Sequence, residues 1–180
     1  KYLSGRNVEA AYHEEIYKMT ISDGLTTVAN VRCLNEFLDR EFARSRRHDR
    51  ELCVLLLDID YFKRVNDEYG HLTGDYVLRE LAQLLRARVR REELLARYGG
   101  EEFCLVLPET TLKGAIQYAE SIRASIEEHE FYYEERRLQV TVSIGVSSYN
   151  SEMTVPKDML KSADEKLYSA KRSGRNRVVA

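Results

Sequence analysis

The sequence predicts an α/β sandwich in which helices flank a central sheet that is mainly antiparallel. A continuous apolar run at 52–57 is typical of a central strand buried on both faces. Two shorter runs, 93–97 and 103–107, joined through Gly99-Gly100, are typical of a β-hairpin. The chain of 180 residues allows one domain with a sizeable core.

The first half of the chain is predicted to be mostly helical around one strand. Apolar residues recur at helical spacing in residues 8–20 and in 31–48, where Leu34, Leu38 and Phe42 share a face. The predicted elements are a helix at 8–20, an irregular link at 23–30, a helix at 31–48, a strand at 51–57, a short helix at 61–69 and a helix at 73–90.

The second half adds the hairpin and alternates strands with helices. The predicted elements are the hairpin 94–107, a helix at 111–129, strands near 131–134 and 137–148, a helix at 156–172 and a short strand at 176–179. The arginine-rich stretch 40–47 closes the helix at 31–48. We interpret it as a solvated helix end, where cations suit the dipole, rather than as a nucleic-acid site.

Composition limits the classes of partner and the setting. The chain has 28 basic and 30 acidic residues, so no net charge attracts it to nucleic acid or acidic membranes. Cys33, Cys53 and Cys104 form no disulfide framework, and the last two lie in apolar strands, which suits a reducing, cytoplasmic setting. No apolar stretch reaches membrane-span length and no signal peptide is visible. Because the chain begins at Lys1, we expect a longer protein with an upstream sensor or regulatory domain, and membrane tethering of that protein stays open.

Two acidic residues follow the central strand. Asp58 and Asp60 are two apart, so they share a face on a strand. Carboxylates at the end of a buried strand are costly to desolvate unless a partner neutralises them, and a hard cation such as Mg²⁺ is one such partner. The alternative is that they cap the following helix. For Asp60 both interpretations stay open, whereas Asp58 combined with the acidic hairpin favours a metal site.

The hairpin carries two glycines and two carboxylates. A two-residue turn needs φ > 0 at both central positions, so we expect this conformation at Gly99 and Gly100. The glycines also leave the backbone open to a ligand. Glu101 and Glu102 follow, and consecutive strand residues face opposite sides. We therefore expect one carboxylate to face a site and the other to support the turn.

Taken together, these motifs resemble the GGDEF domain of diguanylate cyclases in its GGEEF spelling. The resemblance runs from about Asp23 to Val178 and its blocks occur in the family's order. They are Asp23-Gly24-Leu25-Thr26 with Asn30; Asp58 to Lys63; Asn66 to His71; Gly74-Asp75; Arg97 to Phe103; Val142 to Val146; Ala163-Asp164 with Leu167-Tyr168; and Ala170-Lys171 with Gly174 to Val178.

The resemblance implies a βααββαβ arrangement like the palm of nucleotidyl cyclases and polymerases. It also implies that two GTP molecules, on two facing domains, condense into cyclic di-GMP and two pyrophosphates. Asp58, Glu101 and the carbonyl of Ile59 would bind Mg²⁺, or Mn²⁺ instead, with two ions in each site. Glu101 would accept the 3′-hydroxyl proton, although the metal alone can lower that pKa. Residues 1–22 would be a signalling or linker helix and 23–180 the catalytic domain.

Substrate contacts follow from the same resemblance. Lys63 would meet the triphosphate, and Lys171 and Arg175, one helical turn apart, would reach the same phosphates. Without the other motifs, these two would be solvated cations at a helix end. Asn66 and Asp75 would recognise guanine, which adenine cannot mimic. Gly74-Asp75 has a second interpretation, as a helix N-terminal signal.

The family pattern also predicts a regulatory site, with one departure. An inhibitory site for cyclic di-GMP would use Arg90 and Glu93, where relatives have Asp in place of Glu93. The alternative is a local ion pair on an exposed turn, worth only tenths of a kcal/mol. Catalysis across a homodimer is expected. Two other functions remain as alternatives: a non-catalytic module that binds GTP or cyclic di-GMP, and a cyclase of altered nucleotide choice, which Asp75 disfavours.

Overall fold

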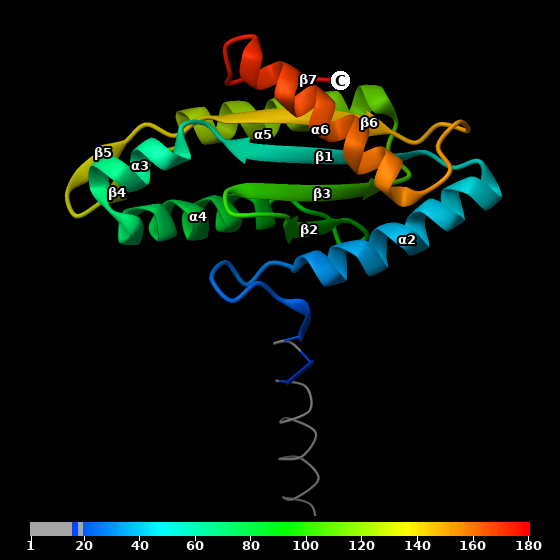
Figure 1. The fold of residues 1–180 in the computed structure, drawn as a ribbon, viewed down its shortest axis with the longest axis horizontal. Helices are drawn as coiled ribbons and strands as arrows, with labels where there is room; N and C mark the ends of the chain where they lie inside the picture. The colour runs from blue at the N-terminus through cyan, green and yellow to red at the C-terminus, as the bar shows by residue number, and fades with distance from the viewer. Residues whose placement is uncertain (1–15, 18–19) are drawn as a thin grey trace, which may run out of the picture.

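The computed structural model describes residues 16–17 and 20–180, so most of the helix expected at 8–20 lies outside the described residues. Figure 1 shows the elements wrapped around one sheet. In chain order they are α2 (Val31–His48), β1 (Leu52–Ile59), α3 (Phe62–Tyr69), α4 (His71–Arg86), β2 (Leu94–Arg97), β3 (Glu102–Pro108), α5 (Leu112–Glu128), β4 (Phe131–Tyr133), β5 (Arg136–Leu138), β6 (Val142–Ser148), α6 (Pro156–Arg172) and β7 (Val178–Val179).

The main sheet confirms the predicted fold class. Its strand order is β2-β3-β1-β6-β7, and β1 runs antiparallel to both neighbours, β3 and β6. Among the strands of the described residues, β6 and β7 pair in parallel, and an isolated parallel bridge joins Ala29 to Ala96 of β2. The strands β4 and β5 form a separate hairpin. The predicted run at β1 is therefore the central strand, buried at every position.

Side chains of β1 alternate between two apolar cores, one on each face of the sheet. Cys53, Leu55 and Leu57 join the core built with α4 and α5. Leu52 and Leu56 join the second core, built with α2 and α6. Figure 1 shows α6 crossing one face of the sheet with α5 on the other. By the same alternation, Asp58 lies on the α6 face.

The backbone of helix α6 packs directly on β6 at a glycine. A Cβ on Gly145 would lie 2.0 Å from the Ala163 carbonyl oxygen and 2.5 Å from the Leu167 amide nitrogen. No side chain fits in that space, so Gly145 fixes how α6 lies across β1 and β6. This packing decides where the C-terminal end of α6, with Lys171, meets the end of β1.

Some predicted boundaries were wrong. The helix expected at 73–90 spans His71–Arg86, and the strand expected at 137–148 is divided into β5 and β6. Beyond α4, the Arg88 carbonyl accepts a hydrogen bond from Tyr118, and the Arg90 amide donates to the Glu93 carboxylate. These hydrogen bonds take the place of those that a continuation of α4 beyond Arg86 would make. The second division arises because β5 pairs with β4 whereas β6 pairs with β1.

Two further expectations concern cysteines and membranes. Cys53 and Cys104 are buried free thiols in strands, as predicted, and Cys33 is a partly buried free thiol on α2. Among the helices of the described residues, none has the length and apolar character to cross a bilayer.

Candidate active site

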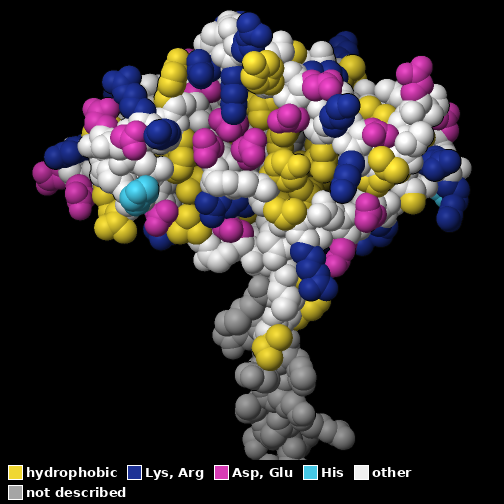
Figure 2. Space-filling model, in the orientation of Figure 1, with side chains coloured by type: hydrophobic (Ala, Val, Ile, Leu, Met, Phe, Trp, Pro, Cys, Tyr) yellow, Lys and Arg dark blue, Asp and Glu magenta, His cyan; other side chains and the backbone are white. Residues whose placement is uncertain are grey.

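The acidic end of β1 and the β2–β3 hairpin meet in the main sheet. Asp58 pairs with Glu102 in the antiparallel register of β1 and β3. One residue further, the Ile59 amide donates to the Glu101 carbonyl at 3.4 Å. Two acidic segments that are far apart in sequence therefore come together at one edge of the sheet. Figure 2 shows acidic side chains gathered between the C-terminal half of α6 and this hairpin, beside basic ones.

Asp58 is the buried member of this group. Its residue is 5% exposed, and one carboxylate oxygen lies 2.8 Å from the Lys171 ammonium. Burial raises the pKa of Asp58 to about 6, and the charges of Glu101 and Glu102 add to that, although the salt bridge with Lys171 lowers it. The desolvation of Asp58 therefore outweighs the stabilisation that the Lys171 ammonium gives to its ionised form.

The hairpin turn differs from the prediction. Residues 98–101 form a longer loop, in which the Tyr98 and Gly99 amides both donate to the Glu102 carbonyl, at 2.8 and 3.3 Å. Neither Gly99 nor Gly100 has positive φ, so the expected two-residue turn was wrong. A longer loop can reverse the chain without the left-handed conformation.

The glycines provide space instead. A Cβ on Gly99 would lie 2.8 Å from a carboxylate oxygen of Glu102, while a Cβ on Gly100 would meet nothing within 4 Å. The Glu102 carboxylate thus lies against the turn, and burial raises its pKa. Gly100 leaves an open surface beside the acidic residues.

The donor set fits a divalent cation that a ligand would complete. In the part of the chain that the structure describes, no three His, Cys, Asp or Glu side chains converge on one point. Asp58, Glu101 and Glu102 nevertheless bring three carboxylates against one nearby ammonium, that of Lys171. Two carboxylates plus a backbone carbonyl suit Mg²⁺, which usually takes its other ligands from water and substrate phosphates.

Asp60 does not cap α3, so that interpretation was wrong. One oxygen accepts from Ser143 at 2.7 Å, and the other accepts from Thr141 at 2.8 Å and from the Asn176 amide at 3.0 Å. The N-cap of α3 is Tyr61, with φ of 56°, and no side chain caps this helix end. The first amides of α3, next to the exposed Lys63, therefore remain available to an anion.

Lys171 and Arg175 were predicted to lie one helical turn apart, and this prediction was wrong. Helix α6 ends at Arg172, and Gly174, with φ of 119°, reverses the chain. The Arg175 amide then donates back to the Ala170 carbonyl at 3.0 Å, which closes a Schellman-type end. Lys171 contacts Asp58, whereas the Arg175 guanidinium lies 4.3 Å above the centre of the Tyr61 ring.

Asn66 and Asp75 are brought close by the packing of α3 against α4. A Cβ on Gly74 would lie 1.9 Å from the Asn66 side-chain oxygen, so the amide rests on the glycine just before Asp75. Both residues are partly exposed. Because α4 begins at His71, Gly74 and Asp75 lie inside the helix, and their interpretation as a helix start was wrong.

The contact between Asp23 and Arg97 was not predicted from the sequence. The Arg97 guanidinium contacts both Asp23 oxygens, at 3.2 and 3.3 Å, and donates to the Gly100 carbonyl at 2.7 and 3.1 Å. Burial alone would raise the pKa of Asp23, but hydrogen bonds from Thr26 and Arg97 hold it below its usual value. The Asp-x-x-Thr spacing is typical of a side chain that closes its own turn, and it could have indicated this role.

The Arg90–Glu93 pair forms a local turn. The Glu93 carboxylate accepts from the Arg90 amide at 2.8 Å and lies 4.0 Å from its guanidinium. The Glu93 side chain is only 5% exposed, whereas that of Arg90 is 73% exposed. Only the arginine is therefore presented to solvent.

Comparisons with known proteins agree with this architecture. The family model "Diguanylate cyclase, GGDEF domain" matches residues 20–177. Diguanylate cyclase A of Treponema denticola is 46% identical over 71% of this chain, and Diguanylate cyclase DgcP of Pseudomonas aeruginosa is 39% identical over 93%. The coiled coil and GGDEF domain of DgcB from Caulobacter crescentus, solved with c-di-GMP, superposes over 100% of both chains with a TM-score of 0.89 and 29% identity.

The fold is that of the solved GGDEF domains, and the acidic end of β1 lies beside a glycine-containing hairpin. The chain belongs to the GGDEF family. It spans 34% and 25% of the lengths of the two curated relatives, so it corresponds to one part of each.

Proposed function

We propose that this chain is a catalytic GGDEF domain, a diguanylate cyclase that condenses two GTP into cyclic di-GMP and two pyrophosphates. The observation that carries the proposal is the meeting of Asp58 with the Glu101-Glu102 hairpin, where carboxylates outnumber the single ammonium. The names of the curated relatives, both diguanylate cyclases, support it.

Asp58, Glu101 and the Ile59 carbonyl are the groups that would hold Mg²⁺, or Mn²⁺ in its place, with two ions in each site. Bound there, such ions neutralise the phosphates and lower the pKa of the attacking 3′-hydroxyl. Glu101 is the side chain that would accept the hydroxyl proton. Glu102, resting against Gly99, would hold the loop in shape.

The cations around the site would supply charge to the triphosphate. Phosphoryl transfer depends mainly on positioning and charge stabilisation. Lys63 and the uncapped start of α3 offer an ammonium and free amides. Lys171 already offsets part of the charge of Asp58, and Arg175 offers a planar fork held over Tyr61.

Asn66 and Asp75 would select guanine. A carboxylate at Asp75 accepts from the two donors on the guanine edge, and the Asn66 amide meets the remaining polar atoms. Adenine would leave Asp75 unpaired. Asp75→Ser should therefore relax discrimination against ATP, and a variant that still rejects ATP in a competition assay would contradict this assignment.

Each domain would hold one GTP, so two copies must face each other during catalysis. The DgcB structure includes a coiled coil beside its GGDEF domain. That neighbour supports a role for residues 1–22 as a signalling or linker helix that joins 23–180 to an upstream sensor or regulatory domain. Dimerisation would then be the step that such a domain controls.

Product control would use the turn at residues 90–93. The DgcB structure contains c-di-GMP. In this chain the exposed Arg90 is the group available to such a ligand, while Glu93 is engaged with the turn itself. We expect added cyclic di-GMP to slow turnover through Arg90, and Arg90→Ala to remove that effect.

The test is cyclic di-GMP formation from GTP and Mg²⁺, measured by chromatography over a wide range of protein concentration. A rate per protein that rises with concentration would support catalysis by a dimer. A fusion to a dimeric coiled coil provides the second arm, with Glu101→Gln as its inactive, folded control. If the fusion binds GTP but forms no cyclic di-GMP, the cyclase proposal is overturned in favour of a non-catalytic nucleotide-binding module.

A further inference from the structure

The turn that follows α6 has an uncommon backbone. Gly174, Arg175 and Asn176 are all left-handed, with φ of 119°, 62° and 46°. Two of the three are not glycine: asparagine tolerates this region, whereas an arginine is uncommon there and depends on surrounding contacts to hold it. The turn carries Arg175, one of the cations assigned to the triphosphate, so the contacts that hold it bear on the active site.

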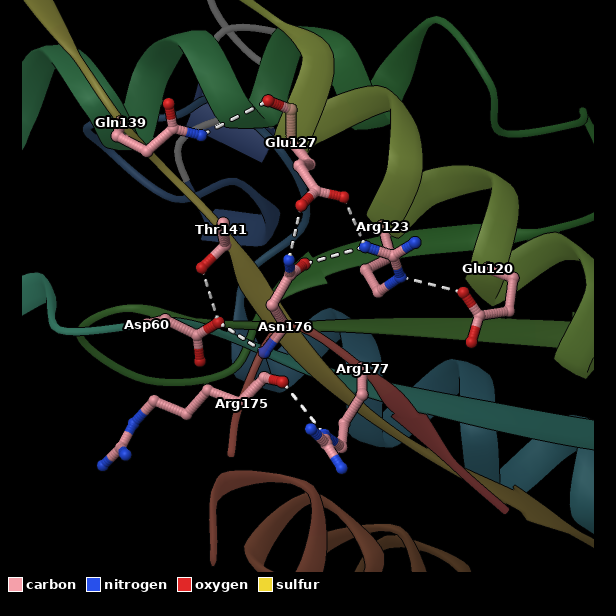
Figure 3. Close-up of polar contacts among 9 residues, drawn as sticks. All are labelled: Asp60, Glu120, Arg123, Glu127, Gln139, Thr141, Arg175, Asn176 and Arg177. Carbon is pink, nitrogen blue, oxygen red and sulfur yellow. Dashed lines mark hydrogen bonds and ion pairs between the residues drawn. The ribbon is translucent and has the colours of Figure 1, made fainter. Parts of the chain in front are cut away.

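Asn176 provides those contacts. Its amide donates to Asp60 at 3.0 Å, its side-chain NH₂ donates to Glu127 at 2.7 Å, and its side-chain oxygen accepts from Arg123 at 2.8 Å. Arg123 is itself paired with Glu120 and Glu127 at 2.8 and 2.7 Å and is 19% exposed. Figure 3 shows Asn176 at the centre of this network.

Asp60 links this network to Tyr61, which contacts the side chain of Arg175. It is 6% exposed and accepts hydrogen bonds from Thr141, Ser143 and Asn176. The next residue, Tyr61, places its ring under the Arg175 guanidinium and accepts a hydrogen bond from it at 3.3 Å. Arg175 is thus held through its backbone, by the Ala170 carbonyl, by the Arg177 side chain and by the neighbouring Asn176, and through its side chain by Tyr61. Figure 3 shows its side chain extending away from the network.

We propose that Asn176, anchored to α5 through Arg123 and Glu127, is a positioning residue that sets Arg175 for the phosphates of the substrate. The proposal rests on the nucleotide-binding function proposed above. Asparagine suits this position because it tolerates the left-handed region and offers both a donor and an acceptor. Glycine would keep the backbone but lose both side-chain bonds, and aspartate would face Glu127 with no donor.

The experiment is a double-mutant cycle on nucleotide affinity. Asn176→Gly, Arg175→Ala and the double variant are titrated with Mg²⁺ and a GTP analogue whose α,β-bridging oxygen is a methylene, which prevents turnover. We expect each single change to weaken binding about tenfold, equivalent to about 1.4 kcal/mol. The double variant should bind like Arg175→Ala alone, because Asn176 acts through Arg175.

Gln139→Ala is the matched control. Gln139 donates to the Glu127 carbonyl at 3.5 Å, at the edge of the network and without contact to Asn176, so affinity should not change. Asn176→Asp replaces Asn176→Gly if the glycine variant does not fold, and it should show the same non-additivity.

Wild-type affinity in Asn176→Gly, or effects of the two single changes that multiply in the double variant, would overturn the proposal. If the unaltered chain binds the analogue but its coiled-coil fusion makes no cyclic di-GMP from GTP, only the cyclase proposal fails, and the cycle still decides the role of Asn176. If the unaltered chain does not bind the analogue, both proposals are overturned.

Discussion

The two hairpins of this protein use glycine and the left-handed backbone in opposite ways. The β2–β3 loop contains Gly99 and Gly100, yet neither has positive φ. The β4–β5 turn contains Glu134 and Glu135, and both do, with φ of 46° and 62°. Tyr133 pairs with Arg136 across that turn, so it is a true two-residue hairpin.

The two hairpins differ in what determines the backbone conformation of their turns. In the first, glycine provides room for the Glu102 carboxylate and an open surface, which are requirements of a site. In the second, two exposed glutamates accept an unfavourable backbone because strand pairing and packing on α4 demand it. Tyr76 of α4 packs on Tyr133 with ring centroids 5.2 Å apart. The glycine pair therefore marks open space beside the carboxylates here, not a left-handed turn.

The largest effect should come from Asp58, the buried carboxylate on β1 that pairs with Glu102 of the first hairpin. Asp58→Asn should lower turnover about a thousandfold, because loss of one metal ligand removes several kcal/mol of charge stabilisation. Cyclic di-GMP formation by the coiled-coil fusion measures this. Turnover within tenfold of the unaltered fusion would contradict the role of Asp58.

The same variant should be more stable without metal. Because its folded pKa is raised from 3.8 to about 6, ionised Asp58 destabilises the fold above pH 6 and costs nothing below 3.8. Asp58→Asn should therefore gain up to about 3 kcal/mol at pH 8 in the presence of chelator, and nothing at acid pH. Urea unfolding at several pH values tests this, and a loss of stability at pH 8 would break the argument.

Asp23→Asn should have the next largest effect. The Asp23 carboxylate binds the Arg97 guanidinium, which in turn donates to the Gly100 carbonyl in the loop of the first hairpin. We expect a loss of about 2 kcal/mol at pH 7. The folded pKa of Asp23 is lowered, so its contribution is present above 3.8 and disappears as the pH falls below that value. Glu36→Gln, which breaks the exposed Arg32–Glu36 pair, is the control and should change stability by less than about 0.5 kcal/mol.

Gly99→Ala and Gly100→Ala form a matched pair within the first loop. The methyl at position 99 would displace the Glu102 carboxylate, so we expect a roughly tenfold loss of turnover with little change in stability. The methyl at position 100 meets nothing and should stabilise by about 0.5 kcal/mol, since it restricts the unfolded chain. Equal losses of activity in both variants would show that the loop needs glycine for another reason.

Changes in the second hairpin should alter stability and leave turnover unaffected. Replacing Glu134-Glu135 by Asn-Gly should stabilise the protein by about 1 kcal/mol, because these residues adopt positive φ at low cost. Turnover should stay unchanged. The Gln-Gln replacement removes the same charges and keeps the strained backbone, so it should give no gain in thermal unfolding. A gain equal to that of Asn-Gly would assign the effect to charge.

The sequence by itself determined the fold class, the central strand and most of the helices. These follow from local patterns: apolar periodicity in α2 and α6, and an unbroken apolar run in β1. It also indicated the family, because the motifs keep their order along the chain. Roles for residues such as Asp58 and Glu101 could be predicted in this way without knowing where the two residues lie relative to each other.

Only the tertiary structure decided which groups contact each other. Asp60 was left between two roles, and neither its hydrogen bonds to residues more than 80 positions away nor the Asp23–Arg97 pair follows from local pattern. Likewise, Gly174 redirects the chain so that Lys171 and Arg175 reach different partners. Local preferences fix elements because they act within a few residues, whereas contacts across the sheet depend on how α5 and α6 pack against it.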